Sequence, residues 1–497
     1  ANAFSGCNTL ETVRMLSGVR TISANAFYGA AGLTEVEIPN TVTEIGANAF
    51  YDCASLTEIV IPNSVTSIGH SAFRGCNSLV KMTLPFVGGN RSTNTSAEKT
   101  ASTIWDGGSR YLFGYIFGGE TYQCDSNRDS TIIYNGTVPE GTTYQGASSY
   151  GSSYYPSGSG TRYYHHYIEV YYIPSSLREI EITDATGISA NAFYGCTMLT
   201  SITLNEGITA INTYAFYNCD GLTEMVIPES VTSIGTYALA ESGNLTEVTL
   251  PSSLTEISDY IFSNCSSLTS VNGNGEVILG ANVTSIGIQA FANCSSITSV
   301  TMQGIVTSIG AQAFDGCVNL VRVNSGIDGK VILQEGLTSI GNFAFRNLGK
   351  ITEVVVPNSV TSIGQGAFQG CNSLVKMTLP FVGGSRSTTT STPSTASSSW
   401  NGGSQYLFGY IFGGAIYSRN SSSKPSSTDI LIYQGENYYR SSYYYYYNRY
   451  YIPSSLREIV ITDATGISAN AFYNCTMLTS ITLNEGITAV NTYAFYN

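Results

Sequence analysis

Charged side chains are scarce in this sequence, and histidine and tryptophan are nearly absent. Only 11% of its 497 residues are charged, and there are three histidines and two tryptophans. An enzyme needs acids, bases or nucleophiles that converge on one site, and this composition supplies few of them. We therefore expect a protein that is not an enzyme and that uses no cofactor.

The charge that is present is mainly acidic, which gives a formal net charge of -13. Because no basic patch interrupts it, the sequence argues against nucleic acid or an anionic membrane surface as a partner. No apolar run approaches the length of a membrane span. The sequence begins and stops inside a repeat, at Ala1 and Asn497, so we expect the natural chain to be longer.

A short repeat makes up most of the chain. In residues 56–76, LTEIVIPNSVTSIGHSAFRGC, Leu56, Ile59 and Ile61 predict the inward positions of a short strand. Pro62 ends this strand because it cannot donate to a ladder. After the corner the pattern predicts a second short extended piece, and the Ala-Phe pair predicts a short helical or 3₁₀ cap on the core.

The Ala-Phe pair recurs at steps of 23 residues through long stretches of the chain. This period, with the pattern LxxIxIP, indicates a leucine-rich solenoid, whose turns bury their apolar faces against one another. The predicted fold is a β-rich α/β solenoid with about 23-residue turns and a parallel sheet on one side. Two longer steps, from Phe262 to Phe291 and from Phe314 to Phe345, predict bulged corners. Fifteen strands are predicted, beginning at Leu10, Leu33, Leu56, Leu79, Leu177, Leu199, Leu222, Leu245, Leu268, Ile297, Leu320, Ile351, Leu374, Leu456 and Leu478.

Two long Tyr- and Ser-rich insertions interrupt the repeats. Each opens with PFVGG, contains LFGYIFGG and re-enters the repeats at YIPSSLR. LFGYIFGG is too apolar for a free linker, so we expect a strand or tight turn docked on the flank of the solenoid. The predicted organisation is leucine-rich repeats at 1–85, an inserted module at 86–172, repeats at 173–380, a second module at 381–451 and repeats at 452–497.

Part of the chain is duplicated. Residues 65–89 match 360–384 at all but three positions, and residues 171–218 match 450–497 at all but three. We interpret this as a recent tandem duplication of a block that contains one module.

Ten of the eleven cysteines lie three residues after the Phe, where other turns carry Ala30, Ser242 and Leu348. A position that accepts such residues indicates a small buried site, so we expect these thiols to be buried and reduced. Disulfides between adjacent turns are the alternative, because stacked Cα atoms fall in the bridging range. Cys124, in the first module, has no partner at its level and is expected to be free. The ten repeat cysteines are Cys7, Cys53, Cys76, Cys196, Cys219, Cys265, Cys294, Cys317, Cys371 and Cys475.

Glutamates recur at the third strand position, and Lys81, Arg322 and Lys376 occupy the same column. Like charges stacked on adjacent strands are mildly unfavourable, and these basic residues relieve the repulsion. We expect a solvated face, with an acidic surface for a ligand or cation as the alternative. The column contains Glu35, Glu58, Glu179, Glu224, Glu247, Glu353 and Glu458.

Histidines and tyrosines of the modules are the other candidate groups. His165 and His166, near Glu169, suggest a metal site, but the second module has no histidine, so no metal site is predicted. The Tyr/Ser/Gly composition resembles that of binding paratopes, and the alternative is that the tyrosines pack on the solenoid or on one another. The candidate contact residues are Tyr154, Tyr155, Tyr163, Tyr164, Tyr167, Tyr443, Tyr444, Tyr445, Tyr446 and Tyr447.

Nine Asn-x-Ser/Thr sequons are candidate N-glycosylation sites in a host that glycosylates. Asn/Ser/Thr-rich sequence produces many such triplets by chance, so their number alone says little. The nine are Asn90, Asn94, Asn135, Asn244, Asn264, Asn282, Asn293, Asn420 and Asn474.

The consensus LTEIVIPNSVTSIGxxAFxGCxSL resembles the BspA-type leucine-rich repeat family of microbial surface proteins. The LPFVGG…LFGYIFG…YYIPSSL module also resembles insertions in large family members from anaerobic bacteria. The resemblance implies a secreted or surface-anchored, non-enzymatic protein that adheres to host matrix proteins or to other cells.

Two functions are compatible with these patterns. The first is an extracellular structural or adhesive protein that forms an extended rod or surface fibre. Its partners would be other copies of itself, or host or cell-surface proteins and glycans. The second is a ligand-recognition receptor that uses the concave sheet face. A receptor should carry an irregular aromatic or charged patch there, and the repetitive Glu, Ser, Thr and Val column favours the first.

Overall fold

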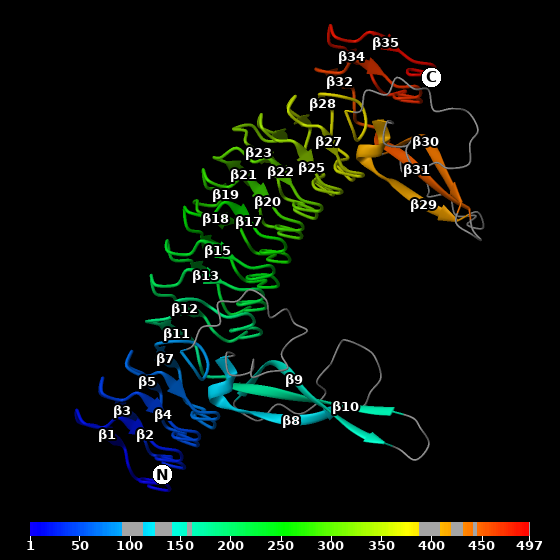
Figure 1. The fold of residues 1–497 in the computed structure, drawn as a ribbon. Helices are drawn as coiled ribbons and strands as arrows, with labels where there is room; N and C mark the ends of the chain where they lie inside the picture. Colours follow the sequence, from blue (N-terminus) through cyan, green and yellow to red (C-terminus); the bar gives the residue numbers. More distant parts are fainter. Residues whose placement is uncertain are drawn as a thin grey trace. The chain divides into compact units, whose positions relative to one another are not determined.

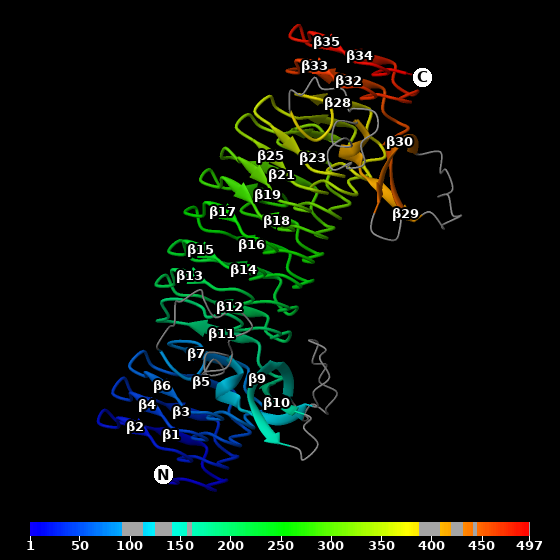
Figure 2. The same ribbon diagram turned by 45° about the vertical axis from the view of Figure 1, so that its right-hand side comes forward.

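The computed structural model describes residues 1–91, 113–124, 142–156, 162–386, 408–418, 431–440 and 445–496. The chain divides into two units, Ala1–Ser253 and Leu254–Asn497. Within each unit, short turns stack on one another and pair their strands (Figures 1 and 2).

Each regular turn contributes one short strand to a parallel ladder. In β5 (Glu58–Val60), Ile59 is 1% exposed and Val60 is 51% exposed, because alternate side chains of a strand lie on opposite faces. Glu58 pairs with Lys81, the first residue of β7 (Lys81–Leu84). The predicted strands and their inward positions are therefore confirmed in this part of the repeat.

In the first unit, this ladder contains β1 paired with β3, the series β5-β7-β11-β12, and β14 paired with β16. In the second unit its order is β18-β19-β21-β23-β24-β26-β28-β32-β34. The remaining bounds are β1 Thr12–Arg14, β3 Glu35–Glu37, β11 Glu179–Ile182, β12 Ser201–Thr203, β14 Glu224–Val226, β16 Glu247–Thr249, β18 Ser270–Val271, β19 Val277–Leu279, β21 Ser299–Met302, β23 Arg322–Val323, β24 Lys330–Ile332, β26 Glu353–Val355, β28 Lys376–Leu379, β32 Glu458–Ile461 and β34 Ser480–Thr482.

A second parallel ladder of two-residue strands confirms the predicted second extended piece. The hydroxyl of Thr66 donates to the carbonyl oxygen of Thr43, one turn back, at 3.1 Å, and this contact recurs along the ladder. Its strands are β2 Thr21–Ile22, β4 Glu44–Ile45, β6 Ser67–Ile68, β13 Ala210–Ile211 and β15 Ser233–Ile234 in the first unit. In the second unit they are β17 Glu256–Ile257, β20 Ser285–Ile286, β22 Ser308–Ile309, β25 Ser339–Ile340, β27 Ser362–Ile363, β33 Gly466–Ile467 and β35 Ala489–Val490.

The helical part of the predicted α/β fold is wrong for the Ala-Phe segments, which are tight turns. Around Phe50, the N–H of Tyr51 donates to Asn48 within the segment, but the N–H of Phe50 donates to Ala72 of the next turn at 2.8 Å. An α-helix keeps all such bonds within one segment. Asn48 also has a positive φ of 54°, which a helix does not accommodate. Alternate N–H groups therefore join neighbouring turns.

Stacked Phe rings fill the core beside these segments. The ring centroids of Phe27 and Phe50 lie 5.2 Å apart, and those of Phe50 and Phe73 lie 5.3 Å apart, with nearly parallel planes. Phe291 and Phe314 of the second unit stack in the same way at 5.4 Å. Each ring buries its faces against the turns on either side, which makes the stack a continuous apolar core.

Nine of the ten repeat cysteines are buried, and all ten are free thiols. The Cys76 thiol donates to the carbonyl oxygen of Phe50 at 3.2 Å, and the hydroxyl of Ser242 makes the equivalent contact with Phe216. The prediction of burial is wrong for Cys7, which is exposed because its turn packs against a neighbouring turn on one side only. The side chain of Cys124 lies outside the described part.

Each of the two longer repeats adds one extra strand to the parallel ladder. β18 and β19 pair through Val271 and Val277, and β23 and β24 pair through Val323 and Val331. The expected bulged corners are thus short loops that fold back to start another strand. The prediction of fifteen strands misses β19 and β24 for this reason.

Candidate functional site

Each module lies within a single enlarged turn of the solenoid. β7 pairs directly with β11, with Lys81 opposite Glu179, and the hydroxyl of Thr83 donates to Glu181, 98 residues further along the chain. In the second unit, β28 pairs with β32 in the same register. The strand ladder therefore continues across the base of each module (Figure 1).

The PFVGG segment replaces the second ladder at the start of each module. The N–H of Ile68 donates to the carbonyl oxygen of Gly89 at 2.9 Å, and the N–H of Ile363 donates to that of Gly384 at 2.8 Å. A Cβ at Gly89 would overlap the ring of Tyr115. Glycine is required here because the module's own segment packs against this position.

The FGYIF part of LFGYIFGG docks on the solenoid as expected, but the prediction of a strand or tight turn is wrong because this part is a 3₁₀ helix. In η2 (Phe113–Phe117), the carbonyl oxygen of Ile116 accepts from the N–H of Phe73 at 2.8 Å, while the N–H of Phe113 donates to Ala192 at 2.9 Å. The rings of Phe113 and Phe193 lie 5.3 Å apart. η2 thus inserts an additional layer between the Phe rings of two regular turns.

The second module repeats this layer with η4 (Phe408–Phe412). The carbonyl oxygen of Ile411 accepts from Phe368, and the N–H of Phe408 donates to Ala471, both at 2.9 Å. The centroids of Phe408 and Phe472 lie 5.2 Å apart. Both 3₁₀ helices therefore belong to the core.

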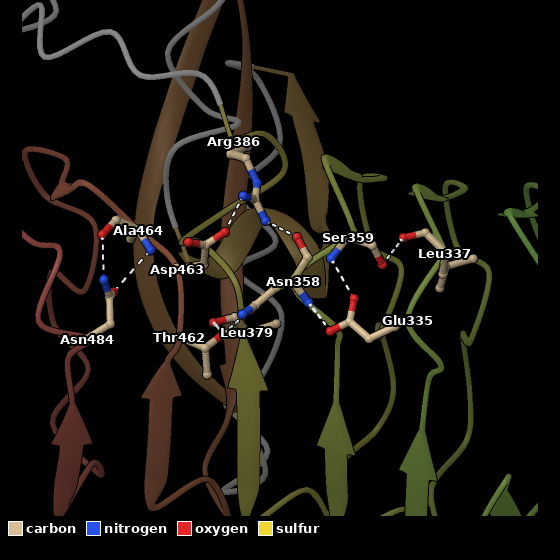
Figure 3. Close-up of polar contacts among 10 residues, drawn as sticks. All are labelled: Glu335, Leu337, Asn358, Ser359, Leu379, Arg386, Thr462, Asp463, Ala464 and Asn484. Atoms are coloured by element: carbon tan, nitrogen blue, oxygen red, sulfur yellow. Dashed lines mark hydrogen bonds and ion pairs between the residues drawn. The ribbon is translucent and has the colours of Figure 1, made fainter.

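An arginine ties the start of each module to the turns on either side. Arg386 forms an ion pair with Asp463 and donates to the carbonyl oxygen of Asn358 (Figure 3). Arg91 makes the corresponding contacts with Asp184 and Asn63. These arginines were not predicted as site residues, although both copies of the block keep the arginine and its carboxylate partner.

Polar contacts extend from this arginine along the corner of the second unit. The hydroxyl of Thr462 donates to the Asn358 side chain at 2.5 Å, and Glu335 accepts from the N–H groups of Asn358 and Ser359 at 3.1 and 3.2 Å. In Figure 3 these residues come from consecutive turns. The module base is thus part of a network that spans several turns.

A three-stranded antiparallel sheet projects from each base, and we call these the first and second tip sheets. The first contains β8 (Gly119–Cys124), β10 (Arg162–Pro174) and β9 (Thr142–Pro156), with β10 in the centre. The second contains β29 (Gly414–Ser418), β31 (Tyr445–Pro453) and β30 (Leu431–Arg440), with β31 in the centre. The two sheets therefore share one strand order.

The register places several candidate contact tyrosines opposite one another. Tyr163 pairs with Tyr155 and Tyr164 with Tyr154, while Tyr167 pairs with Tyr150. In the second tip sheet, Tyr446 and Tyr447 pair with Tyr439 and Tyr438 on one side, and Tyr445 pairs with Arg440. Tyr443 and Tyr444 lie outside the described residues. Whether any of these tyrosines binds a partner stays a prediction.

The predicted charge column is found in the strand ladder, and in the second unit its signs alternate. Lys330, Glu353, Lys376 and Glu458 lie opposite one another in this order. The Lys330 and Glu353 side chains are 2.7 Å apart, and those of Lys376 and Glu458 are 2.8 Å apart. Lys330 is absent from the predicted column because β24, the strand that carries it, was not predicted.

The sequons at Asn264, Asn293 and Asn474 have a backbone explanation. These residues have φ values of 63°, 60° and 58°, and other turns place glycines such as Gly75 and Gly316 there. Asn is among the few residues that favour this left-handed conformation. Asn244, Asn282 and Asn293 are exposed and Asn90 is half-buried, whereas Asn94, Asn135 and Asn420 lie outside the described residues. Glycosylation at all nine stays a prediction.

Two other types of site are absent from the residues that the structure describes. No helix there has the length and apolar character needed to cross a membrane. No group of three or more His, Cys, Asp or Glu residues there is placed to hold a metal ion. The expectation that the protein needs no cofactor remains a prediction.

The repeat geometry agrees with a match to a known family. The BspA type leucine rich repeat region matches residues 1–97, 167–279, 273–381 and 444–497. The chain belongs to the BspA-type leucine-rich repeat family. The residues outside the match, 98–166 and 382–443, lie within the two modules. Repeat proteins of this BspA type are typically binding proteins rather than enzymes.

Several solved structures are similar to this BspA-type chain. A leucine-rich repeat protein from Bacteroides ovatus is 22% identical, with a TM-score of 0.43, over 76% of this chain and 81% of that one. A leucine rich cell surface protein from Faecalibacterium prausnitzii is 20% identical, with a TM-score of 0.31, over 74% and 87%. The pneumococcal vaccine antigen PcpA is 19% identical, with a TM-score of 0.31, over 68% and 70%. Among proteins of curated function, none matches this sequence significantly.

Proposed function

We propose that this BspA-type chain is an extracellular structural or adhesive protein at the cell surface. Its turns build an extended rod or surface fibre, and its tip sheets make the contacts. The partners are other copies of the chain, or host or cell-surface proteins and glycans. It is not an enzyme and needs no cofactor. Membership of the family supports this proposal.

The comparison of base and tip carries the proposal. The two bases share FGYIFGG and the same arginine, and they make matching contacts. The intervening residues, 120–170 and 415–449, differ in length and in sequence. A conserved scaffold that presents variable Tyr-, Ser- and Gly-rich segments is typical of binding surfaces.

Excision of the tips tests this role while leaving the core in place. Gly119 pairs with Tyr171 and Gly414 with Tyr450, so an Asn-Gly turn can replace residues 120–170 or 415–449. We expect the doubly excised chain to fold, to lose binding to epithelial cell monolayers and to lose self-association in sedimentation.

Each single excision serves as the matched control for the other. Hydrogen exchange at η2 and η4 should match the unaltered chain, which shows that the bases remain folded. Unchanged cell binding and unchanged self-association in the double excision would show that the tip sheets have neither role.

We also propose that the exposed sequons are glycosylated if the protein is secreted through a glycosylating pathway. Asn244, Asn282 and Asn293 are exposed and are the first to examine. Peptide mass analysis should find glycan masses there. Unshifted masses at all nine sequons would exclude this part of the proposal.

A second candidate function is ligand recognition on the strand face of the second unit. The loops before β19 and β24 interrupt the repetitive column, and Ser270 and Ser299 are only 3% and 1% exposed there. The Ser299 hydroxyl donates to Glu276 at 2.9 Å. Deleting residues 271–276 and 323–330 restores the regular period. Loss of cell binding in that variant, with binding kept after tip excision, would favour this function.

A further inference from the structure

Four tyrosines of the first unit form a cluster on the turns that follow the first module. The rings of Tyr194 and Tyr217 stack with 4.9 Å between their centroids, and those of Tyr214 and Tyr237 stack at the same distance. The two stacks meet edge to face, with 5.4 Å between the rings of Tyr214 and Tyr217. All four residues are half-buried, so part of their surface remains exposed. We call these four residues the tyrosine cluster.

A carboxylate lies beside the tyrosine cluster. Burial, and after it the Glu241 carboxylate, raise the pKa of Tyr217 to about 12. Burial, then Tyr214 and then the same carboxylate, raise the pKa of Tyr194. An electrostatic effect of this kind weakens with distance, so the carboxylate is close to both phenols. The phenols therefore stay protonated, and the charge next to the rings is negative.

Three of these residues have a backbone conformation that their side chains disfavour. Tyr214, Tyr237 and Glu241 have φ values of 58°, 57° and 60°, in the left-handed region that favours glycine and asparagine. Another turn places Asn191 at the position of Tyr214, with a φ of 59°. At the position of Glu241, every other described turn has glycine, asparagine or aspartate. Residues in such unfavourable conformations gather at functional sites.

A second tyrosine stack in the same unit shows what such a surface binds. Tyr28 and Tyr51 stack at 4.7 Å, and the guanidinium of Arg74 lies over the Tyr51 ring at 5.8 Å. Burial raises the pKa of the Asp52 carboxyl and the charge of Arg74 opposes this rise, so a carboxylate lies close to the cation. In the tyrosine cluster the residue equivalent to Arg74 is Ala240. The chain therefore places rings and a carboxylate together there without an arginine at this position.

We propose that the tyrosine cluster and Glu241 bind an arginine side chain from a basic segment of a partner protein. A guanidinium is planar and stacks on aromatic rings, while its N–H groups bind a carboxylate through two parallel hydrogen bonds. The site lies in regular turns rather than in the tip sheets. The inference therefore goes beyond the proposed function and does not depend on it.

The charge distribution of the chain favours a basic partner over a neutral one. No Lys, Arg or His lies between Arg178 and Arg322, and the acidic residues of this stretch account for the whole net charge of -13. In the first unit, Glu224 and Glu247 lie opposite each other on β14 and β16. Opposed like charges are unfavourable, and a surface of one sign attracts a partner of the opposite sign. A neutral glycan would gain nothing from this charge.

The test measures binding of a short fluorescein-labelled peptide, in which arginine and glycine alternate, to the whole chain by fluorescence anisotropy. Glu241→Asn and Tyr237→Asn are the informative variants, because asparagine occupies both positions in other turns. Both should relieve backbone strain, so hydrogen exchange at residues 233–250 should be no faster than in the unaltered chain. We expect each variant nevertheless to weaken peptide binding by about fivefold to tenfold.

Three controls separate this site from other modes of binding. Glu247→Gln removes a carboxylate from β16 and should leave the affinity nearly unchanged. A peptide with lysine in place of arginine should bind several-fold more weakly, because an ammonium does not stack on rings as a guanidinium does. Excision of both tip sheets should leave peptide binding unchanged, which separates this inference from the proposed function.

Four results would overturn the proposal. The first is equal affinity of the arginine peptide for the unaltered chain and for both asparagine variants. The second is a loss in Glu247→Gln as large as in Glu241→Asn, or equal binding of the lysine peptide, either of which indicates attraction by charge alone. The third is loss of peptide binding on tip excision, which would place the contact in the tips. The fourth is binding of a neutral glucan oligosaccharide that Tyr237→Asn removes and Glu241→Asn does not, which would make the tyrosine cluster a glycan site.

Discussion

The two modules share a base and differ in the sheet above it. At the base, Phe113 and Phe408 are both fully buried, and each donates to an alanine carbonyl of the next turn at 2.9 Å. Above it, β9 is TTYQGASSYGSSYYP and β30 is LIYQGENYYR. Only the base is constrained by the stack of turns, because a change there disturbs the core on both sides.

The constraint on the base is steric as well as apolar. A Cβ at Gly89 or Gly384 would overlap the ring of Tyr115 or Tyr410 and approach an isoleucine carbonyl. Such contacts require backbone without a side chain. The tip sheets contribute no layer to the Phe stack, so their sequences change without this penalty.

The largest expected effect is on the shared layer. Phe113→Ala and Phe408→Ala should each destabilise their base by about 3–5 kcal/mol, because each removes a fully buried ring. Local hydrogen exchange at Ile68–Cys76 and at Ile363–Cys371 measures the loss, since a long repeat array need not unfold in two states.

Equal losses at the two bases would support their equivalence. Phe4→Ala is the control, because Phe4 is 45% exposed and should lose much less. A small loss at either base would mean that its 3₁₀ helix is not a structural layer.

The arginine contacts come next in size. Arg91→Ala and Arg386→Ala should each cost about 1–2 kcal/mol, since each removes a charge-assisted contact from a half-buried position. Lysine substitutions should restore little, because one ammonium does not reproduce the fork of two contacts. The measurement is backbone hydrogen exchange at residues 86–91 and 381–386. Full protection in the alanine variants would show that these contacts are dispensable.

Cys76 and Cys371 occupy equivalent positions in the two copies of the block, so the pH dependence of their stability contributions tests the comparison of the two bases. Burial raises the pKa of both thiols, and neighbouring Cys53 raises that of Cys76 further, whereas Leu348 takes the place of Cys53 beside Cys371. A raised pKa in the folded state means that the unfolded chain releases the proton first. For Cys371 the stability contribution is therefore complete below about pH 9 and is lost as pH rises towards the folded pKa of about 12.

We expect alkylation of native protein between these pH values to be slower at Cys76 than at Cys371, as measured by peptide mass analysis. Cys371→Ser should flatten the loss of stability at high pH, and Ser242 shows that a hydroxyl fits this position. Faster labelling of Cys76 would contradict the assigned effect of Cys53.

The periodic parts of the fold could be predicted because their signal is local. Leu56, Ile59 and Ile61 mark a strand wherever the pattern recurs, and all three are buried. The Ala-Phe segment was predicted as a helical or 3₁₀ cap, and it is a tight turn because alternate N–H groups bond to the next turn, which no short window of sequence reveals. Likewise, the loops before β19 and β24 contain no alternating apolar pattern that marks a new strand.

The site depended on pairings across long separations. Arg91 and Asp184 are 93 residues apart, and Lys81 lies opposite Glu179 only because β7 pairs with β11. Composition identified the tyrosine-rich segments as candidate surfaces. It gave no information on which residues of one module lie together, since that requires the strand order and register.

The smallest expected effect concerns a position where the two bases differ. Ser71 has a φ of 59° and Gly366 has a φ of 65°. A left-handed conformation costs a residue with a side chain about 1–2 kcal/mol, whereas glycine gives back about 0.5–1 kcal/mol through its greater freedom when unfolded. Ser71→Gly should therefore stabilise the first base by roughly 0.5 kcal/mol. The loss of the contact between the Ser71 hydroxyl and His70 at 3.0 Å reduces this gain.

The measurement is hydrogen exchange at Ile68–Cys76, with Gly366→Ser as the reverse change. That substitution should destabilise the second base by more than Ser71→Gly stabilises the first, because its Cβ also meets the ring of Phe343. If Gly366→Ser is neutral, backbone strain is not what separates the two bases at this position.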